Sequence, residues 1–281
     1  MNDATYTLGD FLAVLHGKCL NPKNDASRSE WLGLLRHNWH GLENDAKRDE
    51  PGCAAVRRLI TQGWERGVAL MQEVAASVDL PTPQSIRRRR VWGDFGDEVE
   101  MQRVWQGNID MAWQRMSKTS GLGPQRVRIV VDSVAHAGLG ADTMRWRGVA
   151  ALRLADALTE AGYSVQVESA FEACSPESYR LRVIVKQYTD PLDLSSLAAT
   201  AALPGFFRAL IHQWQYYISK GYIPSCGYNV QSLDPANFVD PNDEGSAMFV
   251  ASQKLKSAED ASNWVTECIR SLQPEEEILA A

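Results

Sequence analysis

The chain has 281 residues, 44% of them hydrophobic and 23% charged, which is typical of a globular protein that can bury a substantial core. Its net charge of -6 argues against general binding of polyanions by the whole surface. The five cysteines include no Cys-x-x-Cys pair, which argues against a disulfide framework and a cysteine-rich zinc site. The N-terminus lacks a signal peptide, and no apolar run approaches the ~20 residues that span a bilayer. The composition therefore predicts a cytoplasmic protein without a membrane anchor.

Residues 1–80 are predicted to form a helical region. Its second half repeats apolar residues at helical spacing, namely Leu59, Ile60, Trp64, Val68 and Met71. The segment Leu80-Pro81-Thr82-Pro83 is the predicted boundary, because proline disfavours helix at the residue before it. Residues 88–281 are then expected to form a second unit, an α/β core with C-terminal helices.

The second unit is predicted to contain a βαβ unit. Before it, apolar residues at helical spacing predict a helix over residues 99–116, either continuous or broken at Gly107. The β-branched run Arg126–Asp132 predicts a strand, and a helix is expected from Asp142 to Ala161. Further strands are expected over Tyr163–Val167 and Leu181–Gln187. A strand, a helix and a strand in this order join parallel strands, so we expect an open α/β sheet.

The C-terminal part is predicted to be mostly helical. Residues 192–220 return to a helical pattern, and Ala247–Ala251 are expected to add a short strand. Ser257 is placed to cap a final helix over Ala258–Leu272.

Three stretches of the predicted α/β core resemble the first half of a von Willebrand factor A domain: Val130-Val131-Asp132, Leu154-Ala155-Asp156-Ala157-Leu158 and Gly162-Tyr163-Ser164-Val165. That fold opens with a strand ending in Asp-x-Ser-x-Ser, and a helix and an edge-forming strand follow. The resemblance implies an α/β fold with a von Willebrand A-like or Rossmann-like open sheet and a helical N-terminal region.

The metal-binding motif of that family is altered in this chain. Asp132 stands at the aspartate, whereas Val134 and His136 stand where the two serines belong. Thr189-Asp190 resembles the Thr-Asp that ends a later strand of the family. Valine cannot bind a metal, and imidazole suits softer metals than Mg²⁺. We therefore predict no metal and no cofactor.

A longer stretch, from Arg88 to Arg208, resembles a group of uncharacterised phage and bacterial proteins. The residues that carry this resemblance include Gly96-Asp97-Glu98, Trp105-Gln106-Gly107, Ala112-Trp113 and Trp146-Arg147-Gly148. It implies a phage or mobile-element origin, and the host cytoplasm as the location.

A partner-binding or ligand-binding lip is predicted at the carboxyl ends of the strands, where open α/β sheets hold their ligands. Its expected members are Asp132, Ser133, His136, Asp190, and Arg145 or Arg147 from the following helix. An arginine paired with Asp132 would supply a guanidinium charge in place of a metal charge. Ordinary loop polarity explains the same residues equally well, and the sequence does not separate the two interpretations.

The densest charge cluster is Arg87, Arg88, Arg89 and Arg90, followed by Trp92. Arginines beside an aromatic ring are typical of contacts to phosphates and stacked bases. Four acidic residues follow at once, namely Asp94, Asp97, Glu98 and Glu100, and pairing with them is the interpretation that we favour.

Catalytic signatures are absent from the sequence, which contains no Gly-x-Ser-x-Gly, no Walker loop and no His-Glu-x-x-His. We therefore predict no catalytic residue and no enzyme activity. The expected function is a binding or adaptor protein that holds a protein partner through the predicted lip. The alternative is a single-stranded nucleic-acid-binding protein, including DNA, that uses the arginine cluster and its aromatic neighbours.

Overall fold

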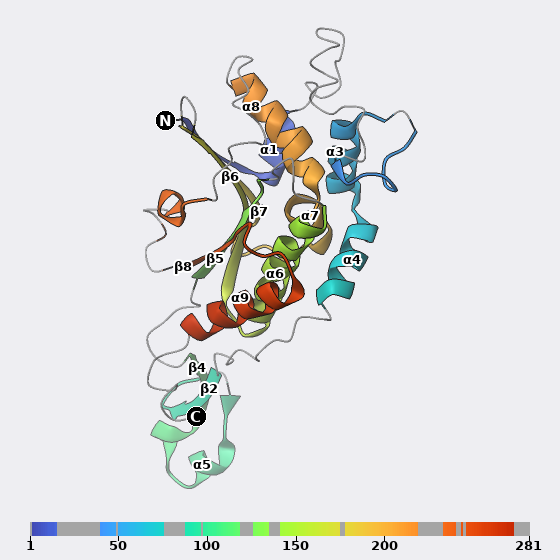
Figure 1. Ribbon diagram of the computed structural model, residues 1–281. Coiled ribbons are helices and arrows are strands. Elements are labelled where there is room, and N and C mark those ends of the chain that lie inside the picture. Colours follow the sequence, from blue (N-terminus) through green and yellow to red (C-terminus); the bar gives the residue numbers. More distant parts are fainter. Residues whose placement is uncertain are drawn as a thin grey trace.

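A five-stranded mixed sheet forms the centre of the molecule, in the strand order β1-β7-β6-β5-β8 (Figure 1). The strands are β1 (Asn2–Thr7), β5 (Arg126–Asp132), β6 (Ser164–Cys174), β7 (Ser178–Lys186) and β8 (Ala247–Ala251). This computed structural model describes residues 2–15, 40–48, 50–75, 88–96, 98–118, 126–134, 141–174, 178–218, 233–239, 243 and 246–272.

The prediction of an open α/β sheet is confirmed. Strands β5 and β6 are parallel and are connected through α6 (Ala141–Glu160), and β8 lies parallel to β5 on its other side. Counted from β5, the order β7-β6-β5-β8 follows the 3-2-1-4 order of doubly wound sheets. In such sheets the strand order reverses between the first and fourth strands, which here are β5 and β8. Strand β7 departs from this pattern, because it is antiparallel to β6.

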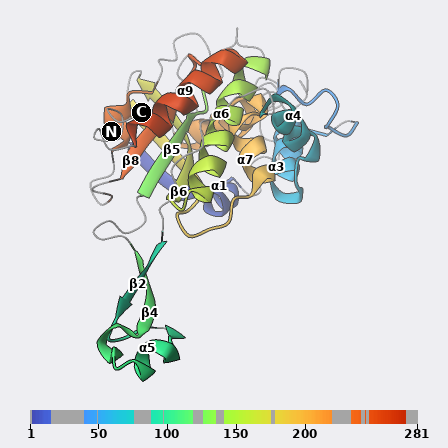
Figure 2. The ribbon, with the colours of Figure 1, turned by 90° about the horizontal axis from the view of Figure 1, so that it is seen from below.

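Helices cover one face of the sheet in two layers (Figures 1 and 2). Helix α6 contacts β5, β6 and β8, and α9 (Ala258–Ser271) packs against α6. Helices α3 (Gly52–Gln62) and α4 (Glu65–Ala75) pack on α7 (Leu194–Ala201), and α4 also contacts α6. Further helices of the α/β body are α1 (Leu8–Val14), the π-helix η4 (Phe206–Ile211), α8 (His212–Ile218) and the 3-10 helix η5 (Pro235–Phe238).

Alternation along the strands explains why the sheet has two different faces. Val127, Ile129 and Val131 of β5 point into the main core beneath α6. Val130 instead joins a small second cluster with Leu233 and Phe238, on the other side of the sheet. Hence the helical face carries the large apolar core, while the opposite face holds few apolar side chains and the charged residues described below.

The prediction of an entirely helical region over residues 1–80 is wrong at its start. Residues 2–7 form β1, which pairs in parallel with β7 and so belongs to the sheet of the predicted second unit. The expected boundary at Leu80-Pro81-Thr82-Pro83 lies outside the described residues. The chain is therefore divided differently: the N-terminal elements and the sheet form one α/β body.

The prediction of a helix over residues 99–116 holds only for a short segment before Gly107, the possible break, and is wrong after it. The chain forms β3 (Glu98–Val99), the short α5 (Met101–Trp105), the 3-10 helix η3 (Ile109–Met111) and β4 (Trp113–Lys118). Gly107 has φ 81°, a conformation that ends a right-handed helix. Strand β4 then pairs with β2 (Arg88–Gly93), a long-range contact that helical periodicity alone does not reveal.

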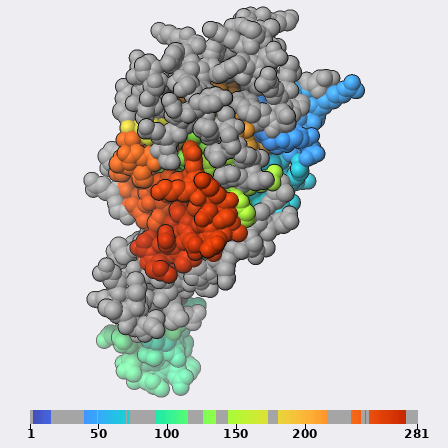
Figure 3. Space-filling view, viewed as in Figure 1, coloured from blue at the N-terminus to red at the C-terminus, as the bar shows by residue number. Residues whose placement is uncertain are grey.

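Residues 88–118 form a separate β-arm rather than part of the core sheet. Strand β4 lies between β2 and β3 in an antiparallel three-stranded sheet. Figure 2 shows β2 and β4 leading away from the α/β body to the tip with α5, and Figure 3 shows the arm projecting below the body. The arm thus presents a surface of its own.

Near the C-terminus, the predicted strand and helix are confirmed. Residues 247–251 form β8, and α9 spans Ala258–Ser271. The Ser257 hydroxyl accepts a hydrogen bond from the Asp260 N–H at 3.1 Å, as the expected cap requires.

No single helix in the described part of the chain is long and apolar enough to cross a membrane. One helix pair reaches that length and composition together, Leu194–Ala201 with Phe206–Gln215, but it is bent by 67°.

Replacement of Gly148 by alanine is expected to destabilise the α/β body. A Cβ at this position would lie 2.9 Å from the Ala202 Cβ and 3.2 Å from the Ala201 carbonyl carbon, so α6 and the end of α7 must separate. We expect a loss of about 1–3 kcal/mol in the free energy of unfolding, measured by denaturant titration. Gly9→Ala is the control, because its Cβ would meet only the Thr7 hydroxyl at 3.9 Å. Unchanged stability of Gly148→Ala would contradict this account of the packing.

Candidate functional site

A buried polar cluster lies at the carboxyl end of β5, beside the reversal of strand order between β5 and β8. We call it the carboxyl-end cluster and define it by five residues: Asp132, Ser133, Arg147, Ser169 and Arg208. Each of their side chains is at most 4% exposed. Doubly wound sheets bind ligands at this place, outside the carboxyl ends of the strands.

Arg147 connects α6 to the end of β5. Its Nη1 donates hydrogen bonds to the main-chain carbonyls of Asp132 and Val134, the latter at 2.9 Å. The guanidinium is fully buried, and its Nε and Nη2 have no hydrogen-bond acceptor among the described residues. Burial lowers the pKa of Arg147, and the charge of Asp132 acts in the opposite direction. A charged group is thus held in the interior mainly by carbonyl oxygens.

The Asp132 carboxyl group makes a hydrogen bond of its own at the end of β5. Its Oδ1 accepts a hydrogen bond from the Val134 N–H at 3.0 Å, as in an Asx turn. Burial raises the pKa of Asp132 to about 6, although Arg147, Gln253 and the Leu233 backbone favour the ionised form. Gln253 follows β8 directly, so the carboxyl group lies between the two strands at the reversal of strand order.

Two serines continue the cluster on the helical side of the sheet. The hydroxyls of Ser133 and Ser169 are hydrogen-bonded to each other, and Ser169 also donates to the Thr200 carbonyl at 3.4 Å. The Ser133 N–H bonds to the Ala170 carbonyl at 2.9 Å. These contacts satisfy both hydroxyls within the protein and fix the end of β5 against β6 and α7.

Arg208 brings a second positive charge to the same region. It lies in the π-helix η4, and such departures from α-helical geometry frequently occur at functional sites. Burial lowers the pKa of Arg208, and the like charge of Arg147 lowers it further. In the next turn, burial together with His40 and Arg208 lowers the pKa of His212 to about 3, so that imidazole is neutral at pH 7.

The structure brings together only some residues of the predicted lip. Asp132, Ser133 and Arg147 meet at the end of β5, but all three are at most 1% exposed. They therefore form an interior cluster and cannot present a protein-docking lip. His136 lies outside the described residues.

Arg145 and Asp190 lie elsewhere. Arg145 lines a small pocket with Glu43 and Arg66, because residues two positions apart point to different sides of a helix. Asp190 follows β7, whose Lys186 pairs with Val167 in antiparallel register. Asp190 is thus at the edge where β5 and β6 begin, opposite to Asp132, and its expected place in the lip was wrong.

Within the described residues, no group of three or more histidine, cysteine, aspartate or glutamate side chains is placed to hold a metal ion. The chemistry that the cluster offers is that of buried guanidinium donors beside one carboxyl group. Such donors suit the binding of anionic oxygens better than proton transfer, because an arginine stays charged at neutral pH.

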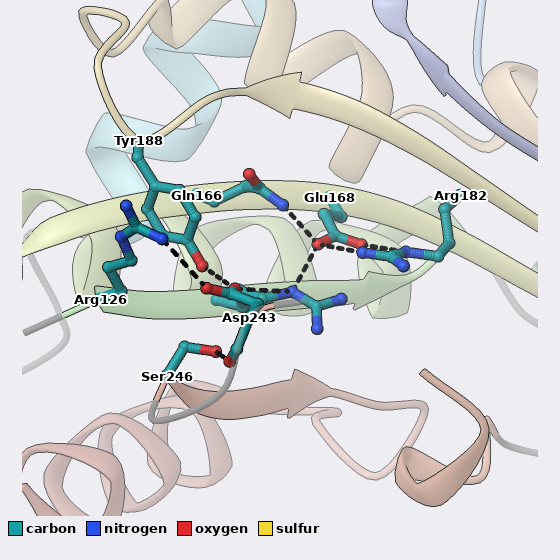
Figure 4. A network of polar contacts seen from close by, with 8 residues as sticks. Arg126, Gln166, Glu168, Arg182, Tyr188, Asp243 and Ser246 are labelled. Atoms are coloured by element: carbon teal, nitrogen blue, oxygen red, sulfur yellow. Dashed lines mark hydrogen bonds and ion pairs between the residues drawn. The ribbon is translucent and has the colours of Figure 1, made fainter. Parts of the chain in front are cut away.

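A second polar site, the ion-pair network, lies on the sheet face opposite the helices (Figure 4). Glu168 is fully buried at its centre, and Arg128 and Arg182 each donate to it at 2.8 Å. Burial raises the pKa of Glu168, but hydrogen bonds from Arg182 and Arg128 outweigh it and hold the pKa below its usual value. Asp243, which accepts from the Tyr188 hydroxyl, extends the network toward Arg128 at 4.0 Å.

The predicted nucleic-acid residues occur in or beside the β-arm. Arg87 lies outside the described residues, and Arg88, Arg89 and Arg90 belong to β2, whose register places Arg88 opposite Lys118. Trp92 is covered on one face by the Arg103 guanidinium, 3.9 Å from its ring centroid. Arg103 in turn pairs with Glu100 at 2.8 Å. One face of the predicted stacking platform is thus already occupied.

Sequence reasoning missed Ser169, Arg208 and the ion-pair network. The network had a detectable signal, since Arg126 and Arg128, Glu168 and Glu172, and Arg180 and Arg182 recur at every second or fourth strand position. This spacing places charges on one face of a strand. No spacing in the sequence pointed to Arg208, because its place in the cluster depends on its nearness to Arg147, which only the folded structure shows.

Glu168→Gln is expected to destabilise the protein by about 3–5 kcal/mol, because it leaves the buried Arg128 without its carboxylate. Denaturant unfolding at pH 7 measures the loss. Arg126→Gln is the matched control: Arg126 is 61% exposed and 3.6 Å from Asp243, so its change should stay within about 1 kcal/mol. Equal losses for the two substitutions would show that burial of the network does not increase its contribution to the free energy of unfolding.

Asp132→Asn is expected to remove a pH dependence of stability. The folded pKa of about 6 exceeds the ordinary 3.8, so the folded state holds this proton more tightly than the unfolded state. The resulting stability is present below pH 4 and is lost as the pH rises toward 6. Between these limits, the wild type should lose up to about 3 kcal/mol relative to the variant.

Denaturant unfolding of both proteins from pH 4 to pH 7.5 tests this expectation. Asp156→Asn, which removes an exposed carboxyl group from α6, serves as the control for the loss of one negative charge. A constant difference between wild type and Asp132→Asn across the range would contradict the raised pKa.

Comparison with known proteins adds one finding. A search of curated proteins and a search of solved structures each found no match. A family model matches residues 20–275, which is most of the chain. The chain therefore belongs to the family described as domain of unknown function DUF7192.

Proposed function

We propose that this protein is a non-catalytic binding protein that holds a protein partner through the tip of its β-arm. The observation that carries the proposal is the exposure of large apolar side chains there. Of eight such side chains in the described chain, six belong to the arm: Phe95, Val99, Met101, Trp105, Ile109 and Met111. Contiguous exposed apolar side chains with a polar surround are typical of protein–protein interaction sites.

Trp105 is the strongest candidate anchor, since it is 80% exposed and tryptophan is enriched among residues that dominate binding energy. Ile109 is 58% exposed and follows it by four residues. A side chain of this size left in water stabilises the isolated arm little, whereas burial against a partner would remove a large apolar area from solvent.

Charge restricts the kind of partner. The sequence from residue 94 to residue 111 holds five acidic residues and only one basic residue, Arg103. That arginine already pairs with Glu100 and lies over Trp92. Asp94, Glu98 and Asp110 are exposed around the apolar side chains. The complementary partner surface is therefore an apolar strip flanked by lysine or arginine.

The tip is held in shape for such a contact. Arg103 connects three parts of it, since it also donates to the Met111 carbonyl at 3.4 Å. The Glu100 N–H bonds to the Ala112 carbonyl at 2.8 Å. A surface that is ordered before binding loses less conformational entropy when the complex forms.

The resemblance to a von Willebrand A domain remains a proposal for the α/β body, and the phage setting remains a prediction. Support for the former comes from the parallel β5, β6 and β8 and from Asp132 at the end of β5. In this proposal the buried Arg147 supplies the positive charge that a metal supplies elsewhere in that family.

A second candidate is single-stranded nucleic-acid binding at the base of the arm. The register of β2 and β4 places Arg88, Arg90 and Lys118 at positions on one face of the strand pair, and Arg89 and Arg115 at positions on the other. Phosphate binding by these residues would show a steep loss of affinity with salt. The acidic, apolar tip is unsuited to this role, so we favour a protein partner.

The double variant Trp105→Ser/Ile109→Ser tests the proposal. A partner captured from native host extract with the wild-type chain, then purified, should bind the variant at least about 30-fold more weakly. The free energy of unfolding should change by less than about 0.5 kcal/mol, because both side chains are exposed.

Val239→Ser is the matched control, an apolar side chain that is 65% exposed outside the arm, and it should keep full affinity. Equal affinity of the wild type and the arm variant would refute the proposal. Salt-dependent binding of a single-stranded oligonucleotide that is lost in Arg88→Gln/Arg90→Gln would favour the second candidate instead.

A further inference from the structure

We propose that the carboxyl-end cluster is a binding site for a small oxyanion group, a phosphate or a carboxylate, held by Arg147 and Arg208. This site is independent of the β-arm and of any protein partner there. It lies where β5 ends and α6 begins, beside the reversal of strand order between β5 and β8.

The first support is the set of hydrogen-bond donors on Arg147. Two of its nitrogens, Nε and Nη2, are buried without an acceptor in the described part of the chain, while Nη1 is fixed by two carbonyls. Buried donors of this kind are rare in native proteins, because each costs the full desolvation of the group. With Nη1 fixed, Nε and Nη2 keep a defined direction, as an oxyanion site needs.

The second support is the balance of charge. Arg147 and Arg208 are 0% and 4% exposed and lie close enough for their like charges to interact. Asp132 is the carboxyl group whose charge acts on Arg147. One oxyanion bound between Arg147 and Arg208 would lower the repulsion between their like charges.

The third support is the position of the cluster at the start of a long helix. Helix α6 begins at Ala141, less than two turns before Arg147, and runs for 20 residues. The aligned peptide dipoles give its N-terminal end a partial positive charge. The helix start and the guanidinium groups therefore favour the same kind of ligand.

Oxygen geometry sets the ligand class. A guanidinium presents parallel N–H donors that match two oxygens of a carboxylate or a phosphate. The shared chemistry is a tetrahedral or planar oxyanion, and it includes both a free ion and the anionic group of a larger ligand. Inorganic phosphate and acetate are the probes that separate the tetrahedral from the planar class.

Two measurements on the full chain test the site. Purified protein is denatured, and the released anions are quantified by ion chromatography. Protein freed of anions by refolding in chloride is then titrated with phosphate and with acetate at constant ionic strength, and its thermal unfolding is followed. We expect either one oxyanion released per chain or a saturable rise of Tm.

Arg147→Met should weaken the bound oxyanion at least about tenfold, since it removes charge-assisted hydrogen bonds. Arg145→Gln is the matched control, because it removes a guanidinium from the same helix outside the cluster, and it should bind normally. If Arg147→Met does not fold, Arg208→Met takes its place. Two results would overturn the proposal. One is that the wild type neither releases an oxyanion nor is stabilised saturably by phosphate or acetate, and the other is that the folded cluster variant binds the oxyanion as well as the wild type does.

Discussion

The hydrogen bonds from Arg147 to the main-chain carbonyls of Asp132 and Val134 set the geometry on which the candidate site depends. They fix the start of α6 against the end of β5, and Gly148 directly after Arg147 allows α6 to approach the end of α7 closely. The strand end, the central helix and the α7 layer therefore meet around one buried charge. That charge is costly to bury, which is why the surrounding polar groups matter for both stability and binding.

Two buried charge arrangements with different roles lie at the sheet. On the face opposite α6, Glu168 is paired with Arg128 and Arg182, so opposite charges compensate one another within the fold. At the carboxyl end, Arg147 lies beside Asp132, whose own pKa is raised by burial, and near the like charge of Arg208. The ion pairs of Glu168 account for that network as part of the folded structure. The Nε and Nη2 donors of Arg147 have no acceptor among the described residues, and the proposed oxyanion would supply one.

In the proposed function, partner recognition takes place on the β-arm and is separate from this interior chemistry. Figures 1 and 2 show the arm leading away from the α/β body to α5, and the exposed apolar side chains belong to α5 and the segments next to it. An adaptor gains from such a separation, because a partner can dock on the arm without disturbing the packing of the sheet. In these proposals, the body is the base of the arm, and the carboxyl-end cluster within it is the site of the oxyanion.

The sequence by itself determined the elements that depend on local patterns. The β-branched run Arg126–Asp132, the amphipathic α6 and the Ser257 cap of α9 follow from residue spacing and are found where expected. It also predicted that Arg145 or Arg147 lies near Asp132 at the strand end, without choosing between the two arginines. These features could be predicted because period, capping and strand propensity act within a few residues.

Only the tertiary structure decided which distant segments pair. It placed β1 at the sheet edge, turned β7 antiparallel and so moved Asp190 to the edge opposite Asp132. It also replaced the expected helix over residues 99–116 with an arm, because β4 gains a partner in β2. Burial, too, was decided there: the sequence offers Asp132, Ser133 and Arg147 as polar residues, and packing by distant helices encloses them. Such outcomes depend on contacts between distant segments, and the energies of these contacts cannot be derived from local sequence patterns.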